Sequence, residues 1–240
     1  MIDLERRSVV VTGGTGNLGA AVAAAYLAAH AHVCVLVRDA AKGEALRASL
    51  AGQAGTSDDP RLLLVPADPA DPAAMAALVD QVMRAWGRLD ILANLAGRFA
   101  VAAPNDVDTA QALWYANVRT ALVATEACLR PMRARGRGRI VSVAASAALR
   151  GGRTAAGYAM SKSAVVRWTE SLAAEVKGEG ITVNCVLPGT IDHPVNRAAM
   201  PKADPTTWAS PAEVAAVILF LSSDGASGVT GAAIPITARA

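Results

Sequence analysis

The chain has 240 residues, of which 53% are hydrophobic, and its formal net charge is only +3. This length and apolar content support a sizeable buried core, and we expect a single domain over residues 1–240. So small a charge argues against a nucleic-acid partner. The one basic run, residues 133–139, is interpreted as a solvated loop between a helix and a strand.

The sequence indicates neither export nor membrane insertion. A strand pattern and a glycine turn follow the first residues directly, where a signal peptide would have its apolar stretch. No apolar run approaches the roughly 20 residues needed to cross a bilayer. The three cysteines, Cys34, Cys128 and Cys185, lie apart in apolar segments and are predicted to be buried thiols in a reducing compartment. We therefore expect a cytoplasmic protein with no membrane partner.

Short β-rich runs alternate with helical stretches along the chain, as is typical of parallel strands joined by crossover helices. The strand interiors are apolar at consecutive positions, which a sheet covered on both faces requires. We therefore predict a Rossmann-type α/β fold, with a doubly wound sheet of about seven parallel strands and helices on both faces. Strands are predicted at 8–12, 32–38, 61–66, 89–95, 138–144, 181–187 and 232–236, and helices near 18–29, 41–50, 72–86, 107–132, 155–178 and 211–222.

The segment 189–211 is the longest piece without clear periodicity. In a compact domain such a piece is often a binding loop or lid. We interpret it as a substrate loop.

A glycine-rich turn at residues 12–19 follows the first predicted strand and opens into a helix. Gly14, Gly16 and Gly19 satisfy the spacing G-x-G-x-x-G. Glycines let the backbone approach a pyrophosphate, whose charge is stabilised by free amides at the helix N-terminus. In this setting the pattern predicts a dinucleotide site rather than a plain connector.

The residues that end the second strand bear on which dinucleotide binds. A carboxylate there would accept hydrogen bonds from an unphosphorylated ribose. This chain instead has Arg38, followed by Asp39. Arginine can pair with a 2′-phosphate through two charge-assisted hydrogen bonds, so NADP(H) is favoured. NAD(H) stays possible, because Asp39 is adjacent and Arg38 could stack on adenine or face solvent.

Tyr158 and Lys162 form a candidate catalytic pair. Residues four apart lie on one helix face, so the lysine can stand beside the tyrosine. An adjacent ammonium favours the phenolate and is expected to lower the tyrosine pKa. Tyr158 would then serve as a general acid or base, and Lys162 could also reach a ribose hydroxyl. The pair predicts hydride transfer to or from a small molecule, with no metal required.

The motifs occur in an order that resembles the short-chain dehydrogenase/reductase family, in its single-domain form, over nearly the entire chain. The five landmarks are the turn at 12–19, Asp68, the Asn-x-Ala-Gly turn at 94–97, the Tyr158–Lys162 pair and Pro188-Gly189. The resemblance implies that Asp68 contacts adenine, that the 94–97 turn lines the cofactor site and that Pro188-Gly189 lies by the nicotinamide. It also implies that Asn117 holds a water for proton relay and that the protein is a homodimer or homotetramer, formed through the helices 107–132 and 155–178.

Two sets of site residues follow from the motifs and the resemblance together. The catalytic set is Tyr158, Lys162 and Asn117. The cofactor-binding set is Gly13, Thr15, Gly16, Asn17, Leu18, Gly19, Arg38, Asp68, Pro69, Asn94, Ala96, Gly97, Tyr158, Lys162, Pro188, Gly189 and Ile191.

Ala145 departs from the family pattern, because a serine that polarises the substrate oxygen is usual at this position. Ser142 and Ser146 are near in sequence, but strand alternation sends them to the opposite face. Loss of one such hydrogen bond commonly costs a factor of about 10² to 10³ in rate. A simple ketone would therefore be a demanding substrate.

Three functions remain open from the sequence. The first is reduction of a carbonyl compound. The second is reduction of a quinonoid dihydropterin, because the quinonoid dihydropteridine reductase branch also lacks the serine and the segment 193–208 resembles its tail. The third is a regulator that binds NADP(H) without catalysis. His193, where a threonine is common, is interpreted as a semi-exposed loop residue, with contact to cofactor phosphate or substrate as the alternative.

Overall fold

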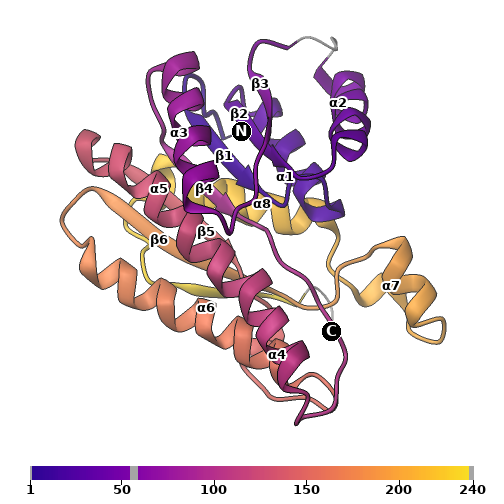
Figure 1. Cartoon of the computed structure of the whole chain (residues 1–240). Coiled ribbons are helices and arrows are strands. Elements are labelled where there is room, and N and C mark those ends of the chain that lie inside the picture. Colours follow the sequence, from indigo (N-terminus) through magenta and orange to yellow (C-terminus); the bar gives the residue numbers. More distant parts are fainter. Residues whose placement is uncertain (1, 55–58, 238–240) are drawn as a thin grey trace.

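The computed structural model describes residues 2–54 and 59–237 and contains one sheet of seven parallel strands. The strand order is β3-β2-β1-β4-β5-β6-β7, so the direction of winding reverses beside β1. The predicted fold class is confirmed, and Figure 1 shows the sheet between two layers of helices. In such sheets ligands bind outside the carboxyl ends of the strands at the reversal point. The strands are β1 (Ser8–Thr12), β2 (His32–Val37), β3 (Leu62–Pro66), β4 (Ile91–Asn94), β5 (Gly138–Val143), β6 (Ile181–Pro188) and β7 (Ala233–Ile236).

The helices match the predicted segments with two differences. The predicted helix 107–132 is interrupted by a π-helical segment, Tyr115–Arg119, and α7 lies inside the region expected to be a loop. Figure 1 shows α7 standing out from the body of the sheet. The α-helices are α1 (Asn17–Ala28), α2 (Ala40–Ala54), α3 (Pro72–Trp86), α4 (Val107–Trp114), α5 (Thr120–Arg135), α6 (Ala156–Glu175), α7 (Pro194–Ala199) and α8 (Pro211–Ser222).

Both faces of the sheet are buried, which explains the continuous apolar runs in the strands. Val9 and Val11 of β1 pack with α1 and α8 on one face. Val10 packs with α3, α5 and α6 on the other. The cysteines Cys34, Cys128 and Cys185 are buried and free, as predicted. Among the described residues, no helix is both long and apolar enough to span a membrane.

The basic run 133–139 is only in part the solvated loop that the sequence suggested. Residues 133–136 are exposed, but 133–135 belong to α5, which ends at Gly136 in the left-handed conformation. Arg139 lies inside β5, is buried, and donates to the main-chain carbonyl of Gly138 at 2.9 Å. The prediction was wrong for 133–135 because the helix continues past its apolar pattern, and wrong for Arg139 because this side chain is buried within the strand.

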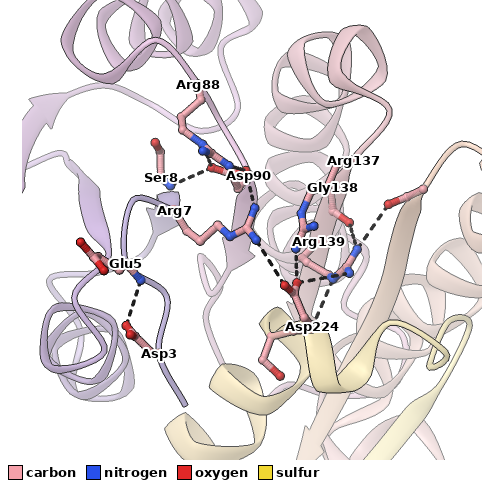
Figure 2. A network of polar contacts seen from close by, with 12 residues as sticks. Asp3, Glu5, Arg7, Ser8, Arg88, Asp90, Arg137, Gly138, Arg139 and Asp224 are labelled. Atoms are coloured by element: carbon pink, nitrogen blue, oxygen red, sulfur yellow. Dashed lines mark hydrogen bonds and ion pairs between the residues drawn. The ribbon is translucent and has the colours of Figure 1, made fainter. Parts of the chain in front are cut away.

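A charged network joins the amino ends of three strands (Figure 2). Asp90, before β4, is only 2% exposed and accepts hydrogen bonds from the Arg88 guanidinium at 2.6 and 2.5 Å and from the Ser8 amide at 3.0 Å. Arg7 lies 3.6 Å from Asp90 and also pairs with Asp224 at 3.2 Å. Burial alone would raise the pKa of Asp90, but these hydrogen bonds outweigh it and lower the pKa. The network holds together the amino ends of these strands, at the end of the sheet opposite their carboxyl ends.

Candidate functional site

The glycine turn lies against the segment that follows β4. Gly13 has φ 68°, and a Cβ there would lie 2.8 Å from the amide nitrogen of Ala96. The Thr12 hydroxyl accepts hydrogen bonds from the amides of Leu95 and Ala96, both at 3.1 Å. These contacts hold the carboxyl ends of β1 and β4 together at the reversal point of the sheet.

The N-terminus of α1 suits an anion. Its N-cap is Gly16, and the first turn has neither a side-chain cap nor an acidic residue among the residues described. By contrast, Asp71 caps α3 and Ser210 caps α8 with side-chain oxygens. The first amides of α1 are therefore available to an external acceptor, which fits the pyrophosphate of a dinucleotide.

A cavity of about 490 Å³ lies in front of this helix end. We call it the first cavity. Most of the predicted cofactor-binding residues line it, including Arg38 after β2 and Asp68 after β3. The predicted residues on this cavity are Gly13, Thr15, Gly16, Asn17, Leu18, Gly19, Arg38, Asp68, Pro69, Ala96 and Gly97.

The structure adds Lys42 to the predicted set, because it lines the first cavity together with Arg38. The adjacent carboxylate of Asp39 accepts a hydrogen bond from the Lys42 amide at 3.1 Å, so it caps the start of α2. Sequence analysis missed Lys42, although its place four residues after Arg38, in the first turn of a predicted helix, was available as an indication.

A second cavity, of about 210 Å³, contains the predicted catalytic pair. Tyr158 and Lys162 line it, together with the predicted residues Pro188, Gly189 and Ile191. Its other lining residues are Leu95, Gly97, Arg98, Phe99, Val143, Ala144 and Ala145. Leu95, Gly97 and Arg98 also line the first cavity, so the two cavities adjoin.

Burial shifts the pKa values of both Tyr158 and Lys162. Lys162 is 5% exposed, donates to the Val143 carbonyl at 2.8 Å and lies with its Nζ 6.0 Å from the centre of the Tyr158 ring. Burial lowers the pKa of Lys162 to about 8 and raises the pKa of Tyr158. The direction for Tyr158 is opposite to the lowering expected from the sequence, because desolvation of the phenol outweighs the neighbouring ammonium.

Asn117 lines neither cavity but is adjacent to both. Its Oδ1 accepts from the Arg98 amide at 2.8 Å, and its Nδ2 donates to the Arg98 carbonyl at 3.1 Å and to the Ser161 hydroxyl at 2.9 Å. A Cβ at Gly97 would lie 2.5 Å from Asn117 Oδ1 and 3.3 Å from Lys162 Nζ. Only glycine therefore fits between Asn117 and the lysine.

Asn94 is the predicted cofactor residue that the structure does not bring to either cavity. Its buried side chain donates to the Thr125 hydroxyl of α5 at 3.1 Å. The side chain of the last residue in β4 thus points toward the helix layer, and Asn94 holds β4 against α5.

Ala145 lines the second cavity in an extended conformation, with φ −164° and ψ 158°. Ser142 is buried within β5, and Ser146 begins a short 3₁₀ turn. Neither serine lines this cavity, as predicted, but Val143 and Ala144 line it together with Ala145, so strict strand alternation does not hold at the end of β5. The wall at Ala145 therefore presents a methyl group to this cavity.

The segment 189–211 is closed at its base and carries α7. Ile191 pairs with Ala209, and the Asn17 side chain donates to the Asp192 carbonyl at 3.4 Å. The Nδ1 atom of half-buried His193 accepts from the Val195 amide at 3.2 Å, so His193 caps α7. The base of the segment thus touches the glycine turn.

A parallel sheet with an uncapped helix N-terminus at its reversal point, beside a cavity that contains the Tyr158–Lys162 pair, defines a dinucleotide-binding α/β protein. The family model described as short chain dehydrogenase matches residues 7–204. The chain belongs to the short-chain dehydrogenase family, which is a family of oxidoreductases that bind nicotinamide cofactors.

Relatives match along almost the whole chain. A cis-4-hydroxycyclohexanecarboxylate dehydrogenase of Sinomonas cyclohexanicum is 35% identical, over 96% of this chain and 94% of its own. Levodione reductase of Leifsonia aquatica is 32% identical, over 96% of this chain and 92% of its own. The structure of an NAD⁺-bound xylitol dehydrogenase superposes with a TM-score of 0.88 and 26% identity, over 98% of each chain.

Proposed function

We propose that this protein is an NAD(P)(H)-dependent oxidoreductase that interconverts a ketone and an alcohol on a small ring. The observation that carries the proposal is the position of Tyr158 and Lys162 in a cavity that adjoins the first cavity through Gly97. The second cavity is smaller than a typical drug-sized site, and its surface is polar and apolar in equal parts, which suits a small ring with a polar substituent. One relative is named for a cyclohexane alcohol.

A bound nicotinamide supplies or accepts the hydride, and the chain manages the proton. Because burial raises the pKa of Tyr158, its hydroxyl stays protonated at neutral pH and can donate to the carbonyl oxygen of the substrate. The phenolate that remains is stabilised by the Lys162 ammonium. Asn117 holds the backbone of Arg98, and with it the wall that the two cavities share.

The methyl group of Ala145 favours a substrate that needs little help from a hydroxyl. Either the acceptor is already activated, or contacts elsewhere fix its position. A quinonoid dihydropterin is an acceptor that is already activated, and its reduction is the second candidate function. A cyclic ketone held firmly by its ring and substituents is fixed by such contacts, and the relative named for a cyclohexane alcohol favours it.

The test is a steady-state assay with NADPH and NADH, using cyclohexanone, a cyclic dione and quinonoid dihydropterin as acceptors. We expect cofactor oxidation with the cyclic ketones. Faster turnover of the dihydropterin would favour the second candidate. Binding of the cofactor in calorimetry without turnover of any acceptor would contradict both and favour a non-catalytic regulator.

We propose further that the cofactor is NADP(H), held at its 2′-phosphate by Arg38 and Lys42. Both side chains are exposed on the first cavity, while Asp39 is engaged in capping α2. Replacing both cations with alanine is expected to raise the KM for NADPH by about 10- to 100-fold, the value of a charge-assisted hydrogen bond. The KM for NADH is the control and should change little. A wild-type preference for NADH would overturn this assignment.

A further inference from the structure

The wall shared by the two cavities carries a cation that the proposed chemistry does not use. Arg98 is exposed and lines both cavities. Among the described residues that line the second cavity, the charged ones are Arg98 and Lys162, and none is a carboxylate. The electrostatic character of this small cavity is therefore positive.

The backbone of Arg98 is fixed. Its amide and its carbonyl are both bonded to the side chain of Asn117, which is in turn anchored on Ser161 of α6. The next residue, Phe99, packs its ring edge-on against Tyr158 with centroids 4.9 Å apart. The backbone that carries the guanidinium is thus held in place beside the catalytic tyrosine, which limits where the charge can lie.

Lys162 is not free to take an anionic substrate group. Its ammonium is buried and bonded to the Val143 carbonyl, beneath the Tyr158 ring. The rest of the wall includes the apolar side chains of Phe99 and Ala145. Arg98 is therefore the group in this cavity that suits an anion, and the apolar side chains of the same cavity suit a hydrocarbon ring.

We propose that Arg98 determines specificity by binding a carboxylate on the substrate, so that the enzyme acts on small cyclic oxo or hydroxy acids. This inference rests on the proposed function. A guanidinium binds a carboxylate through two parallel hydrogen bonds, which fixes orientation as well as position. Anchoring the far end of the ring supplies positioning that the methyl group of Ala145 cannot give at the carbonyl.

The experiment compares 4-oxocyclohexanecarboxylate with its methyl ester, which has the same ring and ketone but no charge. The ratio of kcat/KM for acid over ester is expected to favour the acid in the wild type. We expect Arg98→Gln to lower this ratio by about 10- to 100-fold. Arg98→Lys should give an intermediate ratio, because the charge remains while the paired geometry is lost.

Arg150→Gln is the matched control. Arg150 is exposed on the loop that precedes α6 and lines neither cavity. Its removal tests whether a general positive field, rather than one guanidinium, attracts the acid. The ratio should stay at the wild-type value, and a fall equal to that of Arg98→Gln would overturn the proposal.

Two further outcomes separate the competing explanations. Equal kcat/KM for acid and ester in the wild type would overturn the role of Arg98 and leave the proposed function standing. Calorimetry measures whether Arg98→Gln also lowers cofactor affinity. A fall as large as that of the acid-over-ester ratio would make Arg98 a cofactor ligand instead.

If neither compound turns over, the proposed function fails. Calorimetry with cyclohexanecarboxylate and cyclohexanecarboxamide then decides the role of Arg98, because the carboxylate should bind more weakly to Arg98→Gln and the amide should not.

Discussion

Replacing Tyr158 with phenylalanine is expected to lower kcat/KM for ketone reduction by about 10²- to 10⁴-fold, the usual contribution of a positioned general acid. Phenylalanine keeps the ring that packs against Phe99 but has no proton to give. The wild-type rate should fall as rising pH removes the phenolic proton. Because burial raises the pKa of Tyr158, this fall should begin only in the alkaline range. The residual rate of the variant should lack this pH dependence.

Tyr26→Phe is the matched control for that experiment. The Tyr26 hydroxyl bonds to the Ser222 hydroxyl at 2.7 Å in the core between α1 and α8, on neither cavity. Removal of the Tyr26 hydroxyl should lower the free energy of unfolding but leave kcat per folded molecule unchanged. If Tyr158→Phe reduced the ketone as fast as the wild type does, Tyr158 could not be the proton donor.

Replacing Asp90 with alanine is expected to lower the free energy of unfolding by about 3–5 kcal/mol, as loss of one partner from a buried ion pair commonly does. The change leaves the Arg88 guanidinium and the Ser8 amide without their acceptor. Urea unfolding at neutral pH measures the effect. Asp3→Ala is the control, because that side chain is 61% exposed and its ion pair with the exposed His30 should contribute little.

The pH dependence of stability gives an independent check on Asp90. Hydrogen bonds from Arg88 and Ser8 hold its folded pKa below the ordinary aspartate value of 3.8. The stability that Asp90 contributes is therefore fully present above that value and is lost as pH falls through the folded pKa. Asp90→Ala should show a shallower loss of stability in acid than the wild type. A loss equally steep in both proteins would assign the acid sensitivity to other carboxylates.

The sequence predicts most of the sheet because burial on both faces leaves a strong pattern. Each strand is a short apolar run bounded by turns, so its position can be read from the sequence. Alternation along β5 was a weaker guide, because Ala144 and Ala145 follow the end of the strand and both line the second cavity. The glycine turn was equally predictable, since part of its spacing has a steric cause: a Cβ at Gly19 would collide with the main chain of Gly13 and Gly14.

Other features depend on contacts that no local pattern records. The π-helical segment at Tyr115–Arg119 contains Asn117, whose side chain bonds to a loop 19 residues away. The direction of the Asn94 side chain depends on a partner in α5. The pKa of Tyr158 depends on how deeply the folded chain buries it. Each of these requires the assembled structure.

The charged network and the two cavities occupy opposite ends of the same strands. Residues that share no partners contribute to stability nearly independently, so changes around the cavities need not disturb the network. The sequence at the carboxyl ends of the strands can therefore diverge toward new metabolites while the amino ends preserve the folded scaffold. Such a division makes the chain a tolerant starting point for directed evolution of substrate choice.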